Sequence, residues 1–318
     1  MSTIRVPEEV PTPIQDSSRL NQAFQGWGTD EKTIVSILGR RNATQRREIR
    51  QVYQQVYKES LIGRLEAELS GDFKNAVILW MLDPPKRDAK LANEVLKMKK
   101  KGVDHLKVII EIACATSPHH LMAVRQIYCS LFDCSLEEDI TTYISSPLGK
   151  VLVNLVSSYR YDGEVIDMNL AKSEAATLRG TIEKKQLDNE YLVLILSTRN
   201  IYQLRATFIC YLQTYGNSLY QDIKSCGSSD LASILRAVVW CIDAPEKYFA
   251  EVVRASIAGI GTDEDSLTRA IVSRAEIDMM GIRGEYYNAN KISLDNAVLD
   301  DTSGDYENFL MTLLGTRA

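Results

Sequence analysis

A tyrosine recurs four times in one register along this chain of 318 residues, and the repeat restricts the folds that are open to it. The steps between the tyrosines are 75, 83 and 75 residues, and the positions are Tyr53, Tyr128, Tyr211 and Tyr286. A serine follows each tyrosine by 17 residues and precedes an apolar run. Spacing of this kind is typical of one supersecondary unit that packs against copies of itself.

Within each unit, the apolar residues follow a helical period. In the last segment of the first unit, Phe73, Ala76 and Val77 fall on one helical face. We expect Thr29 to cap an earlier helix of this unit, with Asp30 in its first turn. Strand-like alternation is scarce, so we predict an all-α chain with about five helices in each unit.

The repeat also divides the chain into segments. The wider middle step predicts a polar linker before the third unit, near Ser157–Ser173. Three prolines in the first segment predict that it is not helical. We therefore expect an N-terminal head at 1–15, followed by four repeats at 16–86, 87–160, 161–245 and 246–318.

Charge and composition exclude some partners. The formal net charge is −5, whereas nucleic-acid binding requires a basic face. An acidic membrane would also repel such a chain unless a cation bridged the two. The sequence has no apolar signal-peptide core, and its six cysteines form no CxxC pair. Reduced thiols and a cytoplasmic location are therefore expected.

A short loop motif occurs in the first unit and again in the fourth. Residues 26–30 read Gly-Trp-Gly-Thr-Asp, and residues 259–263 read Gly-Ile-Gly-Thr-Asp. In both units a carboxylate follows the first glycine by 42 residues. Glycines can turn carbonyl groups inward, and Ca²⁺ accepts about six to eight oxygen ligands from carbonyls and carboxylates. The expected Ca²⁺ ligands are the carbonyls of Phe24, Gly26 and Gly28 with Glu68, and the carbonyls of Ile257, Gly259 and Gly261 with Asp301.

The two middle units lack the glycines and the carboxylate together. The residues at these positions are Lys101, Val103 and Tyr143 in the second unit, and Lys184, Gln186 and Cys226 in the third. If the glycines and the carboxylate share a function, they are expected to occur together and to be lost together. A helix-connecting glycine turn beside an unrelated surface acid is the structural alternative. We therefore expect Ca²⁺ sites in the first and fourth units only.

The residues between the paired glycines suggest a membrane contact. Trp27 holds this position in the first unit and Ile260 in the fourth. Tryptophan is enriched at membrane–water interfaces, so we expect both side chains to contact lipid. Packing of Trp27 against its own unit is the alternative. The basic run Lys99–Lys101 lies in the same relative region of the second unit and is interpreted as a solvated turn or a phosphate contact.

Together, the two loop motifs, their distant carboxylates and the fourfold helical frame resemble the annexin family over about residues 15–317. Two functional loops and Trp27 are similar to plant members. The resemblance implies four five-helix repeats packed as a curved disc. It also implies reversible, Ca²⁺-dependent binding to acidic phospholipids such as phosphatidylserine, and hence a peripheral membrane protein. We expect a monomer or weak self-association, and the resemblance leaves actin open as a partner.

Other functions linked with this family find less support in the sequence. A calcium-controlled ion-conducting or transport protein is the alternative, but Met122 stands where many members carry an arginine. The histidine associated with peroxidase activity is replaced by Arg40. No constellation for acid–base or nucleophilic catalysis is found, so we do not expect an enzyme. Cys114 and Cys241 match a two-cysteine plant pattern, for which a redox role is the alternative to ordinary buried thiols.

Overall fold

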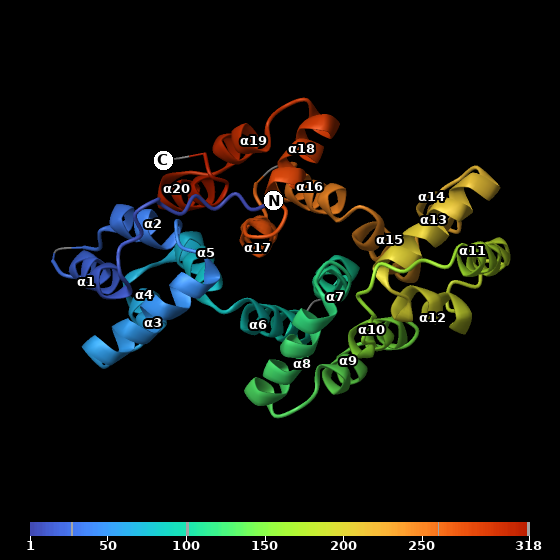
Figure 1. The fold of residues 1–318 in the computed structure, drawn as a ribbon, viewed down its shortest axis with the longest axis horizontal. Helices are drawn as coiled ribbons and strands as arrows, with labels where there is room; N and C mark the ends of the chain where they lie inside the picture. The colour runs from blue at the N-terminus through green and yellow to red at the C-terminus, as the bar shows by residue number, and fades with distance from the viewer. Residues whose placement is uncertain (27, 100–101, 260, 317–318) are drawn as a thin grey trace. The chain divides into compact units, whose positions relative to one another are not determined.

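The tyrosine repeat of the sequence corresponds to a repeat of helices, each with the tyrosine buried. The structure is a computed structural model and describes residues 1–26, 28–99, 102–259 and 261–316. Over these ranges the chain forms twenty α-helices and no strand, which confirms the all-α prediction. The helices belong to two compact units, Met1–Pro84 with Glu246–Ala318, and Pro85–Pro245 (Figure 1).

Each unit of the sequence repeat is called a repeat from here on, and 'unit' refers to the two compact units. The first compact unit contains repeats 1 and 4. Its helices in repeat 1 are α1 (Pro13–Ala23), α2 (Glu31–Leu38), α3 (Ala43–Tyr57), α4 (Leu61–Glu68) and α5 (Gly71–Met81). Those in repeat 4 are α16 (Pro245–Ser256), α17 (Glu264–Arg274), α18 (Met279–Asn290), α19 (Leu294–Asp301) and α20 (Gly304–Leu313). Helix α5 packs against α17 and α20, and α2 packs against α20. Residues far apart in sequence therefore share one core.

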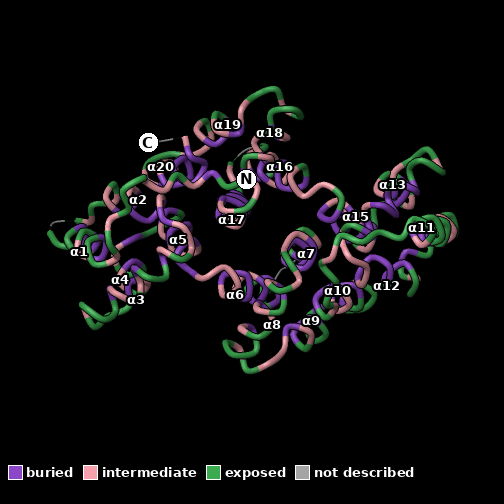
Figure 2. Tube along the Cα trace, viewed as in Figure 1, coloured by how far each residue is buried: buried purple, intermediate pink, exposed green. Residues whose placement is uncertain are grey.

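The second unit contains repeats 2 and 3. Repeat 2 comprises α6 (Pro84–Lys97), α7 (Val103–Cys114), α8 (Pro118–Phe132), α9 (Leu136–Tyr143) and α10 (Leu148–Ser157). Repeat 3 comprises α11 (Met168–Glu183), α12 (Glu190–Thr198), α13 (Ile201–Tyr215), α14 (Leu219–Ser225) and α15 (Asp230–Asp243). Helix α7 packs against α15, and α11 against α13. In both units, buried residues follow the sides of helices that face other helices (Figure 2).

Equivalent helices end in the same way in all four repeats. The third helix of repeat 1, α3, ends at a residue in the left-handed conformation, which satisfies the last carbonyl groups of the helix. The equivalent residues and their φ values are Lys58 at 60°, Asp133 at 56°, Gly216 at 80° and Lys291 at 62°. The repeating tyrosine lies on this helix in every repeat and is buried. The sequence repeat is therefore a repeat of local backbone geometry as well.

Two predicted boundaries are wrong by a few residues. The head was expected to be non-helical through residue 15, but α1 begins at Pro13. Proline fits the first position of a helix, because its missing N–H group would have no partner there. The linker was expected to extend to Ser173, but α11 begins at Met168, where Asp167 caps it by accepting hydrogen bonds from two backbone N–H groups.

The head is attached to repeat 4. The Thr3 hydroxyl donates a hydrogen bond of 2.6 Å to the carbonyl of Leu313, and the Thr3 N–H donates one of 2.9 Å to the carbonyl of Ala275. Thr3 is itself buried. The first residues of the chain therefore lie on its last repeat, within the first unit.

Candidate metal centres

Each loop motif is closed at its base by a main-chain hydrogen bond. In repeat 1 the loop connects α1 to α2, and the Asp30 N–H donates to the Ala23 carbonyl at 2.9 Å. In repeat 4 the loop connects α16 to α17, and the Asp263 N–H donates to the Ser256 carbonyl at 2.7 Å. The same bond in the same register fixes both ends of each loop.

The glycines of both loops have backbone conformations that other residues rarely adopt. Gly26 and Gly28 have φ values of 133° and 92°, and Gly259 and Gly261 have values of 120° and 92°. An added Cβ would contact no other atom within 4 Å, so space does not explain the glycines. Backbone conformation does, because an L side chain is strained at these positive φ values. The described glycines are exposed at the surface.

The helix cap after the repeat 1 loop lies one residue later than predicted. Asp30, not Thr29, caps α2, since its carboxylate accepts a hydrogen bond of 3.0 Å from the Thr33 N–H. Asp263 caps α17 in the same way. Hydrogen bonds from the Thr33 hydroxyl and N–H lower the pKa of Asp30. The carboxylate therefore stays ionised at the positive end of the helix dipole.

Thr29 instead brings the distant carboxylate to the loop. Its hydroxyl donates to Glu68 Oε2 at 2.9 Å, and the hydroxyl of Thr262 donates to Asp301 Oδ2 at 2.5 Å. Glu68 ends α4 and Asp301 ends α19, so both carboxylates come from the same place in their repeats. The prediction that the loop and the remote acid belong together agrees with this geometry. The threonine that joins them was missed, although the shared register of Thr29 and Thr262 was a signal for it.

Arg64 is a second residue that the sequence prediction missed. It lies one turn before Glu68 on α4, and its Nη2 atom is 2.9 Å from Glu68 Oε1. The guanidinium also donates to the carbonyl of Phe24 at 3.4 Å. It thus contacts two of the four predicted ligand groups of repeat 1. A motif comparison could not reveal it, because Ala297 holds the corresponding position in repeat 4.

The donor groups suit a hard divalent cation. Each predicted set consists of three backbone carbonyls and one carboxylate, and therefore only of oxygen atoms, which Ca²⁺ prefers. In each repeat the loop threonine holds the carboxylate against a loop whose glycines have positive φ values. By chemistry and local geometry, both sets fit Ca²⁺.

The middle repeats lack this geometry where the structure describes them. In repeat 3, Lys184 has a helical φ of −82°, and the Cys226 thiol donates to the carbonyl of Ile182 at 3.6 Å. Ile182 is the counterpart of Phe24, and its carbonyl accepts hydrogen bonds from this thiol and from the Lys185 N–H, the latter at 2.9 Å. In repeat 2, Val103 begins α7 and Tyr143 ends α9 with an exposed side chain. Lys101 lies outside the described residues.

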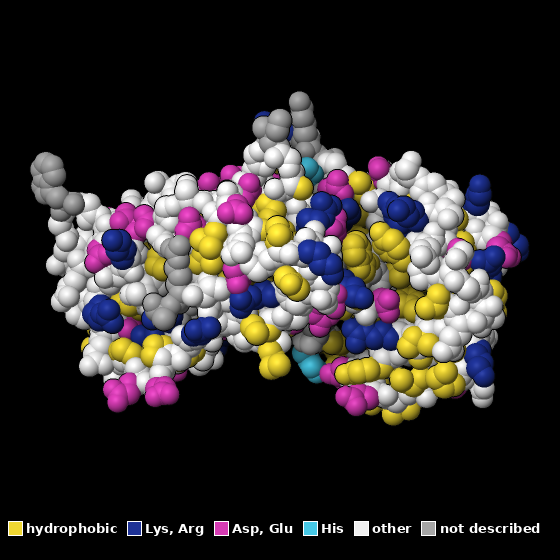
Figure 3. All heavy atoms as spheres, turned by 90° about the horizontal axis from the view of Figure 1, so that it is seen from above, with side chains coloured by type: hydrophobic (Ala, Val, Ile, Leu, Met, Phe, Trp, Pro, Cys, Tyr) yellow, Lys and Arg dark blue, Asp and Glu magenta, His cyan; other side chains and the backbone are white. Residues whose placement is uncertain are grey.

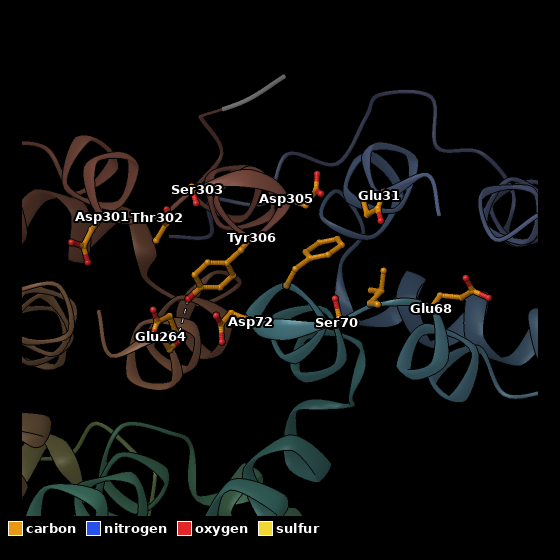
Figure 4. Close-up of a pocket in the computed structure, with 12 residues that line it drawn as sticks. Glu31, Glu68, Ser70, Asp72, Glu264, Asp301, Thr302, Ser303, Asp305 and Tyr306 are labelled. Atoms are coloured by element: carbon orange, nitrogen blue, oxygen red, sulfur yellow. Dashed lines mark hydrogen bonds between the residues drawn. The ribbon is translucent and has the colours of Figure 1, made fainter. Parts of the chain in front are cut away.

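An acidic groove lies between the carboxylates of repeats 1 and 4. It has a volume of about 370 Å³, and Glu68 and Asp301 lie at opposite ends of its labelled residues (Figure 4). The other carboxylates that line it are Glu31, Asp72, Glu264 and Asp305. Six acidic side chains on one surface of this unit attract cations and repel anionic phosphates.

The remaining predicted residues lie elsewhere. Trp27 and Ile260 are outside the described residues. Cys114 on α7 and Cys241 on α15 are both buried, on two helices that pack together. Burial raises the pKa of Cys114 to about 11, although the charge of Arg160 opposes the shift. The thiol of Cys114 is therefore protonated at neutral pH, which disfavours thiolate chemistry.

The surface gives no sign of a basic binding face where it is drawn. On the face shown in Figure 3, acidic and basic side chains of the described residues are interspersed. Among the helices that the structure describes, none is long and apolar enough to cross a bilayer.

Comparison with known proteins agrees with the fourfold repeat. The Annexin family model matches residues 15–80, 87–155, 173–238 and 248–313. Annexin D3 of Arabidopsis thaliana is 56% identical over 320 aligned positions, which cover all of both chains. Annexin III is similar in structure, with a TM-score of 0.92, 31% identity and coverage of 99% of this chain and 97% of its own.

A second solved structure is informative about the metal. Calcium-bound annexin (Sm)1 has a TM-score of 0.86 and 30% identity, over 99% of this chain and 93% of its own. Annexins bind calcium and, in a calcium-dependent way, acidic phospholipid membranes, and the family is generally non-enzymatic. Four matched repeats, a close plant relative and the shared helical architecture lead to one conclusion: this chain belongs to the annexin family, and it resembles the plant annexins.

Proposed function

We propose that the loops of repeats 1 and 4 bind Ca²⁺ and that the bound ions attach the protein to acidic phospholipid membranes. The ligands in repeat 1 are the carbonyls of Phe24, Gly26 and Gly28 with Glu68. Those in repeat 4 are the carbonyls of Ile257, Gly259 and Gly261 with Asp301. The observation that supports this most directly is the pairing, in both repeats, of positive-φ glycines with a remote carboxylate held by a loop threonine.

Calcium is needed because the protein and the membrane carry charge of the same sign. The chain has a net charge of −5, and six carboxylates, Glu68 and Asp301 among them, line the acidic groove. Three carbonyls and a bidentate carboxylate supply about five oxygens, so one to three positions of the Ca²⁺ shell are left for water or a lipid phosphate. The ion therefore neutralises local charge and binds both surfaces.

Removal of the two ligand carboxylates tests this proposal. The double variant Glu68→Gln, Asp301→Asn keeps the size of the side chains, and we expect it to lose Ca²⁺-dependent sedimentation with phosphatidylserine vesicles while remaining folded. The matched control is Asp72→Asn, Asp305→Asn, which removes the same charge from equivalent positions in the groove. Unchanged sedimentation of the first variant, or equal loss in both, would contradict the assignment of the ligands.

The tips of the loops complete the proposed membrane contact. Trp27 and Ile260 would enter the lipid interface when the neighbouring carbonyls bind the ion, since tryptophan partitions to that region. We expect Trp27→Ala to weaken vesicle binding and to leave Ca²⁺ affinity in solution unchanged. The difference between the fluorescence spectra of wild type and Trp27→Ala gives the signal of Trp27. If this signal does not change when vesicles are added, the contact is contradicted.

The proposal includes the organisation and location of the protein. The repeats extend over 16–86, 87–160, 161–245 and 246–318, and each segment matched by the family model overlaps one of them. The protein is cytoplasmic and associates with membranes when calcium rises. Cell fractionation with and without a calcium chelator tests this, and protein that stays with the membranes in chelator would contradict it.

A further inference from the structure

The two proposed sites differ in whether a charged side chain contacts the ligand groups. Their glycines have nearly the same φ values, and both carboxylates accept a hydrogen bond from the loop threonine. In repeat 1, Arg64 Nη2 contacts both Glu68 Oε1 and the carbonyl oxygen of Phe24, at 2.9 and 3.4 Å. In repeat 4, the corresponding residue is Ala297, which is buried and uncharged.

The guanidinium contacts two of the groups that are proposed to bind the metal ion. Thr29 bonds Glu68 Oε2 and Arg64 bonds Oε1, so both oxygens of this carboxylate already have partners. The Phe24 carbonyl also has Arg64 as a partner. The guanidinium carbon of Arg64 also lies over the Phe24 ring, 5.7 Å from its centroid. Calcium in repeat 1 would therefore bind beside a cation that already contacts two of its four protein ligand groups.

The repeat 4 site carries no such competitor among the residues that the structure describes. In this repeat the Thr262 hydroxyl donates to Asp301, to Oδ2 at 2.5 Å and to the main-chain carbonyl at 3.2 Å. The Thr262 hydroxyl is neutral, so it orients the carboxylate without cancelling its charge. A neutral donor leaves the attraction for a divalent ion intact, whereas a guanidinium opposes it by Coulomb repulsion.

We propose that Arg64 is a built-in competitor for Ca²⁺ in repeat 1. The repeat 4 site fills first, and the repeat 1 site fills at higher calcium, once the guanidinium has left Glu68 and Phe24. This inference rests on the proposed function, because it assumes that both loops bind the ion. The chain would then respond to calcium in two steps, with one loop bound before the other.

The test isolates each site and removes the competitor. The background Asp301→Asn leaves only the repeat 1 site, and Glu68→Gln leaves only that of repeat 4. Into the first background we would introduce Arg64→Gln, which is neutral and similar in length. The matched control is Arg47→Gln, which removes the same charge from α3, where the guanidinium pairs with Asp83. Without lipid, the melting temperature is followed as calcium is added, because a bound ion stabilises the folded state by mass action.

The expected result is a lower calcium requirement for repeat 1. Arg64→Gln should reduce the half-saturating calcium concentration about three- to tenfold, while Arg47→Gln changes it less than about twofold. In EDTA, Arg64→Gln should lower the melting temperature by about 1–2 °C through loss of its contacts. With Arg64 present, the repeat 4 site, measured in Glu68→Gln, should saturate at a lower calcium concentration than the repeat 1 site, measured in Asp301→Asn.

The outcomes separate this inference from the proposed function. Equal half-saturation in Arg64→Gln and its parent overturns the competitor role while leaving the Ca²⁺ sites in place. The competitor role is also overturned if the repeat 1 site saturates at a lower calcium concentration than the repeat 4 site while Arg64 is present. If calcium changes the melting temperature of neither the Asp301→Asn background nor its Arg64→Gln derivative, the repeat 1 site is itself refuted, and the competitor role with it.

Discussion

A single threonine in each loop connects two parts of the chain that lie 39 residues apart. Thr29 and Thr262 have the size of valine, but their hydroxyls donate to the ligand carboxylates Glu68 and Asp301. A carboxylate held by a neutral donor keeps its charge and loses rotational freedom before the ion arrives. This preorganisation reduces the entropic cost of binding.

Substitution of Thr29 by valine tests that role. Thr29→Val keeps the shape and removes the donor, so we expect Ca²⁺ affinity in repeat 1 to fall about three- to fivefold and stability to fall by about 0.5–1 kcal/mol. Calorimetric titration in the Asp301→Asn background measures the first quantity. The control is Thr198→Val, at a half-buried threonine in α12 whose hydroxyl donates to the Leu194 carbonyl. No difference from this control would show that Thr29 does not orient the acid.

Cys114 gives the fold a dependence on alkaline pH. Its pKa is raised to about 11 by burial, so the folded state retains a proton that the unfolded chain releases near its ordinary pKa. The stability contributed by this group is complete below about pH 9 and is lost as the pH rises towards 11. Relative to Cys114→Ala, the wild type should lose about 1–2 kcal/mol between about pH 8 and pH 10 in urea unfolding. Parallel pH profiles of the two proteins would contradict this assignment.

At the scale of the helix, the four repeats use one type of termination with different residues. The third helix of each repeat ends in a left-handed residue, which is glycine in repeat 3 and lysine or aspartate in the others. Because a Cβ is strained in this conformation, repeats 1, 2 and 4 carry a local cost that repeat 3 avoids. The left-handed cap therefore lies at the same position in all four repeats, but its contribution to stability differs with the residue that forms it.

Exchange of these cap residues should change stability in opposite directions. Lys58→Gly should raise the free energy of unfolding by about 0.5–1 kcal/mol, and Gly216→Ala should lower it by about 1 kcal/mol. Gly180→Ala is the control inside α11, where the added Cβ has open space and helix propensity alone should stabilise by about 0.5–1 kcal/mol. Chemical denaturation measures all three. A destabilised Lys58→Gly variant would mean that the lysine side chain contributes more than its backbone strain costs.

At the scale of the whole molecule, both proposed Ca²⁺ sites belong to one compact unit. Repeats 1 and 4 come from the two ends of the chain and share the core between α5, α17 and α20. The head belongs to the same unit, since Thr3 bonds the carbonyls of Ala275 and Leu313. Binding of calcium and attachment of the head therefore act on the same folded body.

Removal of the head should affect this unit alone. Deletion of residues 1–6 removes the buried Thr3 and leaves two carbonyls of repeat 4 without this donor, so we expect a loss of about 1–3 kcal/mol. Hydrogen exchange should become faster in α18 and α20, and should be unchanged in α11 and α13. Val10→Ser, at an exposed position of the head, serves as the control. Equal acceleration in both units would contradict a local role for the head.

The sequence by itself determined the all-α class, the four repeats and the residues of both loops. These features depend on local chemistry, namely helical periodicity, glycine conformation and a fixed spacing to a carboxylate, and all of these are visible along the chain. It also limited the candidate sites to repeats 1 and 4. Even its errors at Pro13, Met168 and Thr29 were shifts of a few residues at helix ends, where several residues compete for the same cap.

Only the tertiary structure decided which side chains contact each other at the sites. Thr29 and Arg64 were not recognised, because one contacts an acid 39 residues away and the other contacts a carbonyl 40 residues away. The same holds for the attachment of Thr3 to the last repeat and for the pairing of repeats 1 and 4 in one unit. Such contacts arise from the packing of helices that are distant in sequence, and no local pattern encodes a distance across a fold.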